Sequence, residues 1–485
     1  MIKKPILYSP AGDIKKGFSS IFFDADGVYL GLEKFGLRKS GNIKFEELKN
    51  FIEYCHNLNR KIDITLNAYL KNYEIEEFKN YLEKIILLNP DSIIFSDPAV
   101  ILLYNEIIKK ISKKRYIEKF PYLTLSTQSN TTNYYSMKFW NQHNIHRIVA
   151  ARELTLTELY QIKKLQKLEN LNFELEVFIH GAMCVSISGR CLLSLYMTNK
   201  KFSKKGGETV RDANRGECVH PCRFAYLVEE SRANEYFPIE EDGKYSYILS
   251  SKDLCLLYYI PLFIYAMVDA FKIEGRMKSA FYASTITFTY RKAIDKAFEI
   301  FKDINLEENT LLNYFENPDS FLHDFPDWKN FADNLNIYTE LASHRPYTTG
   351  FYFKEEHPSY MMPLYENKLE NNYLLIAEHI PYEKLYFKDL SYKTNININI
   401  NQLKQNQFMI FSKNSIKVEN ITFNLFCKKG IFKLVNFKIF DLLYNQIQTI
   451  QHSNHYIIEL DEKLVSNTNL RREQIFFIFT EKKDL

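Results

Sequence analysis

Short runs of β-type residues alternate with longer stretches of helical periodicity over roughly the first 300 residues of the chain. This alternation is typical of parallel strands joined by helical crossovers. Helical segments such as 45–58 and 75–87, with apolar residues every three or four positions, lie between eight segments of strand character. The predicted strands are 6–9, 27–31, 62–67, 92–96, 123–128, 147–152, 175–180 and 270–274. Eight such strands predict an α/β fold, a TIM-like (β/α)8 barrel.

The rest of the chain divides into three further parts. About 90 residues separate the seventh and eighth predicted strands, so a cysteine-containing insertion precedes the last strand. Residues 304–344 are rich in Asn, Asp and Phe without a clear period, and we interpret them as a linker with helical turns. Short strands then follow one another, at 373–377, 395–401, 407–411, 423–427 and 456–460. The predicted domains are therefore a barrel at 1–303, the linker at 304–344, and a small all-β, barrel-like domain at 345–485.

Charge and hydropathy exclude several classes of protein. The 63 Lys and Arg residues against 59 Asp and Glu residues give a net charge of +4, too small to indicate nucleic-acid binding by itself. The amino terminus lacks the apolar run of a signal peptide. The longest uncharged stretch, residues 254–268, has 15 residues where a membrane-spanning helix needs about 20, and we interpret it as a buried helix. We therefore expect a cytoplasmic protein with no membrane partner.

Polar residues follow nearly every predicted strand. In a parallel barrel the carboxyl ends of the strands form the working face, so these residues are expected to lie together. Such a collection indicates a site for a polar, anionic substrate. The alternative for Ser9, Asp13 and Asp97 is that they cap the helices that follow. The full set is Ser9, Asp13, Gly31, Asn67, Asp97, Gln128, Arg152, Glu153, His180, Glu274 and Arg276.

Four of the seven cysteines form a distinct pattern. Six, twenty-six and three residues separate Cys184, Cys191, Cys218 and Cys222. Four thiolates make a complete ligand set for a [4Fe–4S] cluster or a structural zinc ion. Zinc sites usually pair their cysteines with two to four intervening residues, so the wider first pair favours iron–sulfur.

Two further features have both a functional and a structural interpretation. Lys204, Lys205, Arg211 and Arg215 lie between the cysteine pairs, where they are able to contact RNA phosphates or simply to form a solvated loop. His180, at a strand end, is either a proton carrier or a satisfied core histidine.

The cysteine region resembles a known family. Residues His180-Gly-Ala-Met-Cys184 and Ser188-Gly-Arg-Cys191, followed by Arg211-Asp-Ala-Asn-Arg-Gly-Glu-Cys218-x3-Cys222, resemble the signature of the peptidase U32 family, whose members are often described as collagenase-like proteases. The chain is similar in particular to the members that act in hydroxylation of wobble uridine in bacterial tRNA. Ser9-Pro-Ala-Gly-Asp13 and Lys272-Ile-Glu-Gly-Arg-Met-Lys-Ser279 agree, and the resemblance spans residue 5 to about residue 300.

The resemblance implies an enzyme with a barrel domain, a tRNA uridine hydroxylase. Its reaction is oxygen-independent, draws on prephenate, yields 5-hydroxyuridine and uses a [4Fe–4S] cluster on the four cysteines. Prephenate carries two carboxylates, which suit Arg38, Arg152, Arg276 or Lys278 as clamps. We assign Asn67 and Gln128 to the same substrate and expect His180, Glu153 and Glu274 to be catalytic.

The expected partners are tRNA, placed by Lys204, Lys205, Arg211 and Arg215, and an electron donor or a paralogous subunit. Two alternatives stay open for the function. One is a collagenase-like peptidase of the U32 family, and the other is a non-enzymatic iron–sulfur scaffold. Residues 200–210 look like an insertion relative to the family, and the carboxyl domain matches the family only loosely.

Overall fold

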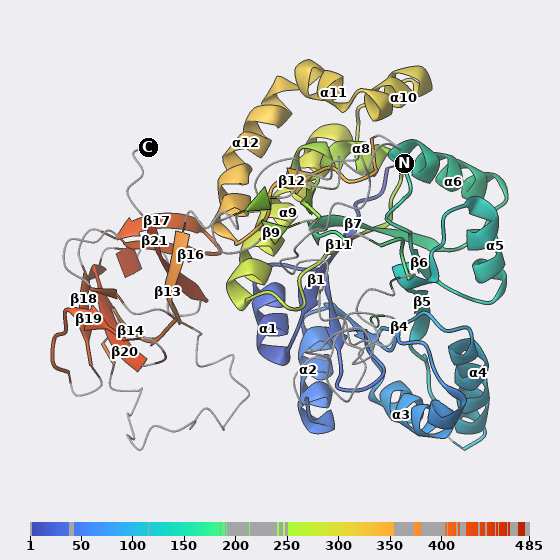
Figure 1. Cartoon of the computed structure of the whole chain (residues 1–485), viewed down its shortest axis with the longest axis horizontal. Helices are drawn as coiled ribbons and strands as arrows, with labels where there is room; N and C mark the ends of the chain where they lie inside the picture. The colour runs from blue at the N-terminus through green and yellow to red at the C-terminus, as the bar shows by residue number, and fades with distance from the viewer. Residues whose placement is uncertain are drawn as a thin grey trace. The chain divides into compact units, whose positions relative to one another are not determined.

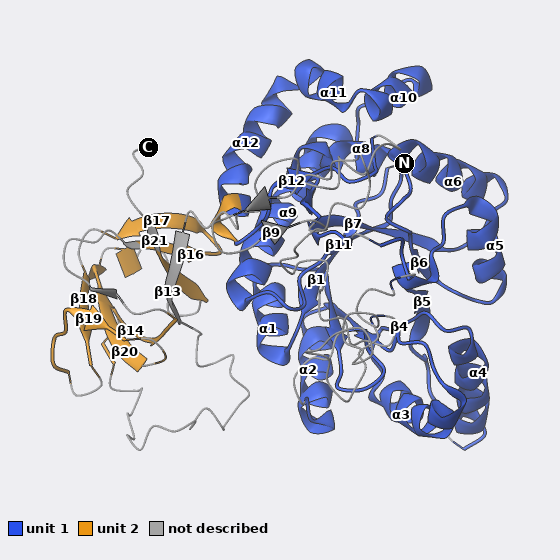
Figure 2. Cartoon of the chain, in the orientation of Figure 1, with its two compact units in different colours: residues 1–339, 343–370 blue, residues 340–342, 371–485 orange. Residues whose placement is uncertain are grey.

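The structure is a computed structural model of the whole chain. It describes residues 2–37, 43–114, 116–184, 186–189, 191, 213, 240–241, 246–247, 251–353 and, with gaps, 373–480. These residues form two compact units, each described here by itself (Figure 2). The first unit comprises residues 1–339 and 343–370, and the second comprises residues 340–342 and 371–485.

Eight parallel strands close into a barrel in the first unit (Figure 1). They pair in sequence order, and the last strand pairs with both the seventh and the first, which closes the sheet. All eight predicted strands are present with bounds shifted by a few residues, and the predicted (β/α)8 barrel is confirmed. The strands are β1 (Ile6–Ala11), β2 (Gly27–Gly31), β3 (Lys61–Thr65), β4 (Ser92–Phe95), β5 (Tyr122–Leu125), β6 (Arg147–Val149), β7 (Glu174–Ala182) and β11 (Ala270–Ile273).

Two short strands extend the barrel sheet beyond β7. Strand β10 (Asp253–Cys255) pairs with β7 in the antiparallel sense, and β12 (Tyr347–Thr348) lies parallel to β10. Because β12 comes from a segment far along the chain, this extension brings residues 343–348 to the carboxyl-terminal end of β7. Strands β8 (Glu240–Glu241) and β9 (Ser246–Tyr247) pair with each other and, among the described residues, with no other strand.

Helices surround the barrel strands (Figure 1). Side chains begin several of them: Asp13 accepts a hydrogen bond from the backbone N–H of Lys16 at 2.8 Å, and Thr155 forms a capping box with Glu158. Asn89, with a φ of 55°, ends the third helix in the left-handed conformation. The helices are α1 (Ile14–Phe22), α2 (Phe45–Asn57), α3 (Ile75–Leu88), α4 (Ala99–Ser112), α5 (Tyr134–Gln142), α6 (Leu156–Leu168), α8 (Ile260–Tyr265) and α9 (Ala280–Phe301), with 3-10 turns η1 (Asn72–Glu74), η2 (Thr127–Ser129) and η5 (Leu257–Tyr259).

The apolar stretch 254–268 is not the single buried helix that its hydropathy predicts. It contains part of β10, the turn η5 and the six-residue helix α8. Pro261 lies at the start of α8, because proline has no N–H to donate and fits only the first turn of a helix. The stretch is buried as expected, yet the main chain changes direction twice within it.

The segment interpreted as a linker forms three helices, α10 (Glu308–Glu316), α11 (Pro318–Asp324) and α12 (Pro326–Leu341). Proline begins two of them, at the position where a missing N–H costs nothing. Trp328 is buried and its indole N–H donates to the carbonyl oxygen of Tyr258 at 2.7 Å. Aromatic side chains that pack on Phe301 hold the segment to the barrel helices, and the segment belongs to the first unit except for residues 340–342.

The second unit is an all-β domain, as predicted (Figure 2). Its seven-stranded sheet has the order β17-β16-β21-β13-β14-β20-β18, and one buried face carries residues such as Leu425, Ile458 and Phe477. The predicted edge strand at 395–401 lies outside the described residues. The strands are β13 (Tyr373–His379), β14 (Gln407–Ser412), β16 (Phe423–Cys427), β17 (Gly430–Leu434), β18 (Phe437–Phe440), β20 (His455–Leu460) and β21 (Ile475–Thr480), with β15 (Ile416–Lys417) and β19 (Thr449–Ile450) as a separate pair.

The inside of the barrel holds charged side chains from four strands, Asp63, Arg147, Glu176 and Lys272, which we call the interior charge cluster. The Arg147 guanidinium lies 3.2 Å from Asp63 Oδ2 and 3.3 Å from Glu176 Oε2. Lys272 Nζ donates to Glu176 Oε1 at 2.6 Å. The ring of Tyr8 lies 4.5 Å from the Arg147 guanidinium carbon. Buried charges are tolerated only when they are paired in this way.

Asp63 is the least well compensated member of the interior charge cluster. Its Oδ1 atom is buried without a hydrogen-bond partner among the described residues. Burial raises the pKa of Asp63 to about 7, against the lowering effect of Arg147. The Arg147 guanidinium therefore offsets only part of the cost of burying this carboxyl group.

No helix within the described ranges combines the length and the apolar character that crossing a membrane requires.

We predict that Arg147→Leu lowers the free energy of unfolding of the barrel by about 3–5 kcal/mol, because it leaves buried carboxylates without their cation. Urea denaturation of the full chain measures this. The control is Lys79→Ala, which removes the surface ion pair to Glu106 and is expected to cost at most about 1 kcal/mol. Equal losses in the two variants would contradict a structural role for the interior charge cluster.

Candidate active site

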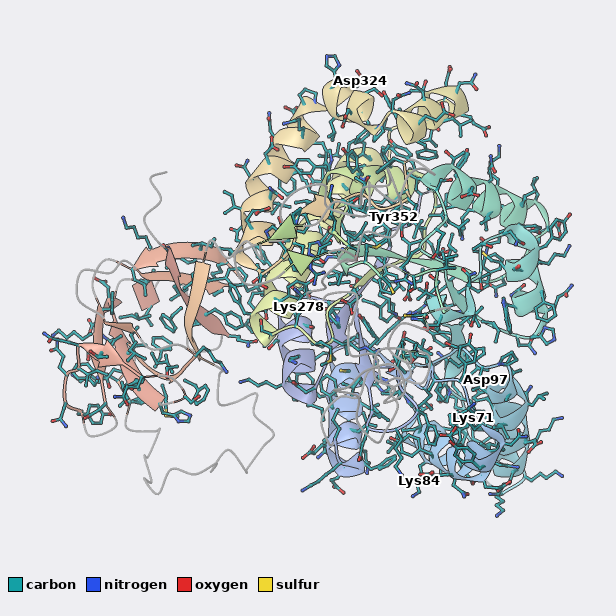
Figure 3. All side chains as sticks on the ribbon, in the orientation of Figure 1. Lys71, Lys84, Asp97, Lys278, Asp324 and Tyr352 are labelled. Carbon is teal, nitrogen blue, oxygen red and sulfur yellow. The ribbon has the colours of Figure 1, made fainter. Side chains whose placement is uncertain are left out.

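The carboxyl ends of the barrel strands meet at one face, here called the barrel mouth. Some of the polar residues predicted there serve the fold. Asp13 caps α1, and Asp97 accepts hydrogen bonds from the backbone N–H groups of Ala99 and Leu70, both at 2.9 Å (Figure 3). Ser9 is buried and shares a 2.6 Å hydrogen bond with Thr287 of α9. The capping interpretation therefore holds for Asp13 and Asp97.

His180 lies near the carboxyl end of β7 with only 1% of the residue exposed. The rings of Tyr282, Tyr290 and Tyr347 surround its imidazole, with centroids 6.0, 5.3 and 5.6 Å away. The Tyr290 hydroxyl donates to the carbonyl oxygen of Ile179 at 3.0 Å and lies 3.2 Å from His180 Nδ1. Because a hydroxyl has one hydrogen to donate, we assign the imidazole proton to Nδ1.

The other ring nitrogen of His180, Nε2, is buried and has no hydrogen-bond partner among the described residues. Burial, with smaller contributions from His344 and Lys278, holds the pKa of His180 well below its usual value. The imidazole is therefore neutral at neutral pH and presents a lone pair. Such a nitrogen is able to accept a hydrogen bond, or a proton, from a ligand.

Residues from the extension of the sheet complete this side of the mouth. Lys278 Nζ donates to the carbonyl oxygen of Ser343 at 2.9 Å (Figure 3). The ring of His344 stacks on Tyr347 with centroids 4.2 Å apart. The Glu274 backbone N–H donates to the carbonyl oxygen of His180 at 2.8 Å. This half-buried glutamate therefore lies beside β7, the strand that carries His180.

Arg276 is buried at the mouth and connects it to the barrel interior. Its guanidinium donates to Thr65 Oγ1 at 2.7 Å and lies 5.7 Å from the centre of the Tyr29 ring. Lys272, of the interior charge cluster, lies 4.2 Å from the centre of the same ring. Tyr29 therefore lies within cation–π range of both cations.

Arg152 and Glu153 hold the loop that follows β7. Arg152 Nε donates to Ser188 Oγ at 3.1 Å, while the two oxygens of Glu153 accept from the N–H and the hydroxyl of Ser188 at 2.9 and 3.1 Å. Gly189 has a φ of 76°, and a Cβ there would lie 1.9 Å from the carbonyl oxygen of Gln128. The position therefore requires glycine for close packing of this loop on the mouth.

Asn67 and Gln128 lie in the segments that follow β3 and β5, two strands with β4 between them. The Asn67 side chain is buried, accepts from the N–H of Leu37 at 3.0 Å and donates to Ser126 Oγ at 3.3 Å. The carbonyl oxygen of Gln128 accepts from the hydroxyl of Tyr69 at 3.1 Å, and its side chain is half-buried. The structure therefore brings both residues to the mouth, as the strand assignment predicts.

Half of the cysteine set lies within the described residues. Cys184 follows β7 and is exposed, and Cys191 is half-buried two residues beyond Gly189. The described residues contain no group of three or more metal-ligating side chains. The remaining predicted ligands and contacts lie outside the described residues: Cys218, Cys222, Arg38, Lys204, Lys205, Arg211 and Arg215.

Sequence reasoning missed four residues at the mouth, Tyr29, Thr65, Tyr290 and His344. Tyr29 and Thr65 lie on predicted strands, and the two-residue period was the signal that could have assigned them to the barrel interior. Tyr290 lies within α9 and His344 follows α12, and no local pattern marks either residue. Together the mouth offers cationic side chains and one neutral imidazole, which suits an anionic ligand that carries a hydroxyl or N–H donor.

The description "Peptidase family U32" belongs to the family model that matches residues 12–362. The chain is a member of this family. The tRNA hydroxylation protein P1 of Bacillus subtilis is 35% identical over 296 residues, which cover 60% of this chain and 64% of that protein. The tRNA hydroxylation protein P of Escherichia coli is 29% identical over 416 residues, 77% of this chain and 80% of that protein. An uncharacterized protease of Methanocaldococcus jannaschii is 31% identical over 350 residues, which cover 72% of this chain and 73% of that protein.

We predict that Glu153→Ala speeds hydrogen exchange at the Ser188 amide by about tenfold or more. The variant leaves this buried N–H without its acceptor, at a cost of about 1–3 kcal/mol. Peptide-level exchange measured by mass spectrometry tests this, with Glu169→Ala at the exposed end of α6 as the control. Unchanged exchange in peptides that contain Ser188 would show that Glu153 does not hold the loop.

Proposed function

We propose that this U32 chain is a tRNA-modifying enzyme that converts wobble uridine to 5-hydroxyuridine without molecular oxygen. The observation that carries the proposal is the 29% identity, over 77% of the chain, to a relative named tRNA hydroxylation protein P. Relatives in Bacillus subtilis and Helicobacter pylori bear similar names and are each 35% identical over 60% of the chain. Substrate and reaction are therefore proposed from similarity, and the barrel mouth is where we place the chemistry.

The proposed hydroxyl donor is prephenate, which has two carboxylates and a hydroxyl group. Arg276 and Lys278 supply positive charge on one side of the mouth, and Arg152 supplies it on the loop after β7. We propose that the lone pair on His180 Nε2, which has no hydrogen-bond partner among the described residues, accepts a hydrogen bond from the hydroxyl group of the ligand. These four residues would bind and orient a small dianion.

The donor set fits an iron–sulfur cluster, with zinc as the alternative. Cys184 and Cys191 lie on the loop that Arg152 and Glu153 hold at the mouth. We propose that these two thiolates, with Cys218 and Cys222, hold a [4Fe–4S] cluster. When bound, such a cluster supplies one-electron transfer. The donor of those electrons would be a separate reductase or a paralogous subunit.

The target base must reach the mouth as an unstacked nucleotide, because chemistry on uracil C5 is not possible within a stacked helix. A tRNA anticodon loop supplies such a base at low cost. Lys204, Lys205, Arg211 and Arg215 are proposed to contact the phosphates of this RNA. The proposal for these four residues rests on their sequence position.

The family name and the relative described as a protease favour a peptidase as the second candidate. Peptide hydrolysis requires an activated nucleophile or a metal-bound water. Within the described residues, His180 Nδ1 bonds to Tyr290, and no Ser or Cys side chain bonds to the other nitrogen. The described residues therefore contain no nucleophile paired with His180, as a serine or cysteine peptidase would use.

We predict that deleting the gene, in a strain without a parallel pathway, removes 5-hydroxyuridine from tRNA and that the wild-type gene restores it. Lys278→Met is expected to restore about a tenth or less, because it removes a charged hydrogen-bond donor from the mouth. Mass spectrometry of tRNA nucleosides is the measurement. Lys292→Met, on the exposed face of α9, is the matched control.

Unchanged 5-hydroxyuridine in the deletion strain would overturn the proposed reaction. Cleavage of gelatin by the purified protein, lost in His180→Asn, would instead support the peptidase.

We predict that protein purified without oxygen contains about four iron atoms per chain and the absorption of thiolate-bound iron. Cys218→Ala is expected to lose most of this iron, while Cys427→Ala in the second unit keeps it. Metal analysis and absorption spectroscopy are the measurements. Zinc in place of iron would assign the cysteines to a structural zinc site, and the absence of both metals would overturn the cofactor proposal.

A further inference from the structure

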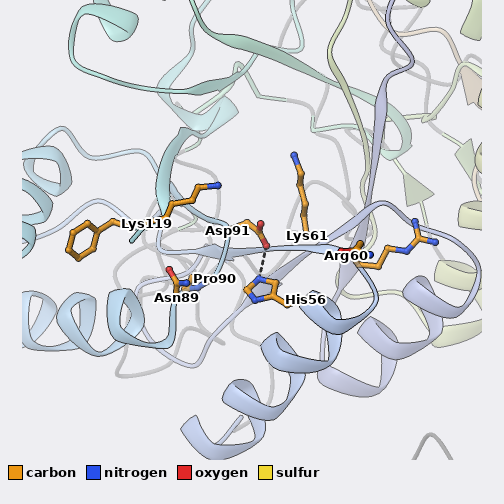
Figure 4. A pocket seen from close by; sticks show the side chains of 9 residues that line it. His56, Arg60, Lys61, Asn89, Pro90, Asp91 and Lys119 are labelled. Atoms are coloured by element: carbon orange, nitrogen blue, oxygen red, sulfur yellow. Dashed lines mark hydrogen bonds and ion pairs between the residues drawn. The ribbon is translucent and has the colours of Figure 1, made fainter. Parts of the chain in front are cut away.

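A pocket lies at the opposite end of the barrel from the mouth. It has a volume of about 390 Å³ and is formed at the amino-terminal ends of β3, β4 and β5 (Figure 4). The end of α2 and the connections that enter these three strands line it. We call it the basal pocket. Its volume lies within the range of small-ligand sites, which begins near 300 Å³.

Basic side chains dominate the lining of the basal pocket. His56, Arg60, Lys61 and Lys119 line it together with one carboxylate, Asp91. Figure 4 shows Lys61 and Lys119 extending on either side of Asp91, with His56 directed at the carboxylate. The lining therefore carries a clear excess of positive charge.

The one carboxylate in the basal pocket is already engaged. Asp91 Oδ2 accepts from the backbone N–H of Ile62 at 2.9 Å and lies 3.0 Å from His56 Nε2. The hydrogen bond to Asp91 raises the pKa of His56, so a larger fraction of the imidazole is protonated at a given pH. Asp91 therefore neutralises His56 first and leaves the charge of the lysines largely uncompensated.

Lys61 and Lys119 form no ion pair with any described carboxylate, whereas Arg60 contacts Asp24 and Asp26 at 3.3 and 3.5 Å. The two lysines come from different connections, at the start of β3 and ahead of β5. Unpaired ammonium groups that converge on a concave site are the usual means of holding a multivalent anion.

A structural explanation also exists for this charge. Helices α2 and α3 end beside the basal pocket, and the negative ends of their dipoles attract cations. Backbone N–H groups already satisfy carbonyls of the last turns, since Cys55 O accepts from Arg60 and Ile86 O accepts from Asn89. Lys119 comes from the connection after α4, so complementing α2 and α3 does not account for its place in this pocket.

We infer that the basal pocket binds a phosphate group, held by Lys61 and Lys119 with Arg60 and His56 beside them. This inference does not depend on the proposed hydroxylation. The same chemistry is available from a small phosphorylated ligand or from one phosphate of an RNA backbone, and the two sources are distinguishable.

We predict that inorganic phosphate binds the full chain at this pocket. Line broadening in the ³¹P spectrum of phosphate, titrated with protein at constant ionic strength, measures it. The Lys61→Ala/Lys119→Ala variant is expected to bind phosphate about tenfold more weakly, because it removes both unpaired charges. Lys292→Ala/Lys296→Ala, which removes two lysines from α9, is the control and is expected to match the wild type.

A second arm measures binding of a tRNA anticodon stem-loop by the same variants across a range of salt concentrations. Unchanged RNA affinity with weakened phosphate binding would assign the pocket to a small phosphorylated ligand. A parallel loss of RNA affinity with a shallower salt dependence would assign it to an RNA phosphate. Circular dichroism checks that the pocket variant and the control are folded. If the folded pocket variant then binds phosphate as tightly as the control and the wild type, the inference is overturned, and the lysines serve only as partners of the helix ends.

Discussion

The barrel depends on the ion pairs between Arg147 and the carboxylates of Asp63 and Glu176. An ordinary barrel interior is filled with branched aliphatic side chains, which are indifferent to their exact partners. A buried guanidinium instead needs carboxylates at fixed positions, so β3, β6 and β7 are tied to one register. Lys272 extends this requirement to β11, the strand that closes the barrel.

The same network reaches the mouth through aromatic rings. Lys272 lies 4.2 Å from the centre of the Tyr29 ring and 6.0 Å from that of Tyr8. The Tyr29 ring also lies within cation–π range of Arg276. Across the mouth, three tyrosine rings and the burial of His180 keep the imidazole neutral with one acceptor nitrogen. Cationic side chains and one hydrogen-bond acceptor therefore occur at the same end of the barrel, a combination that suits an anionic ligand with a hydrogen-bond donor.

Prediction from sequence succeeded for the barrel and its caps, since alternation of strands with amphipathic helices and capping residues such as Asp13 are local signals. It failed where tertiary packing overrides local pattern. Residues 254–268 are apolar throughout, yet the first of them pair with β7 as an antiparallel strand, and Pro261 prevents α8 from extending further toward the amino terminus. The segment 304–344 forms three helices in place of the linker, and α12 buries one face through Trp328, Ala332 and Leu335. This helical spacing is present in the sequence, but the Asn and Asp residues around it obscure the pattern.

By itself the sequence determined the order of strands and helices, the four-cysteine set and the residues at the strand ends, because each follows from neighbours a few positions away. Only the tertiary structure decided which of these residues lie together at the mouth and which form capping or packing contacts of the fold. Arg147 and Asp63 are 84 residues apart, and His180 meets Tyr290 across 110 residues. Ion pairing and imidazole tautomer depend on such contacts, and no local pattern encodes the distance between atoms that only the closed barrel brings together.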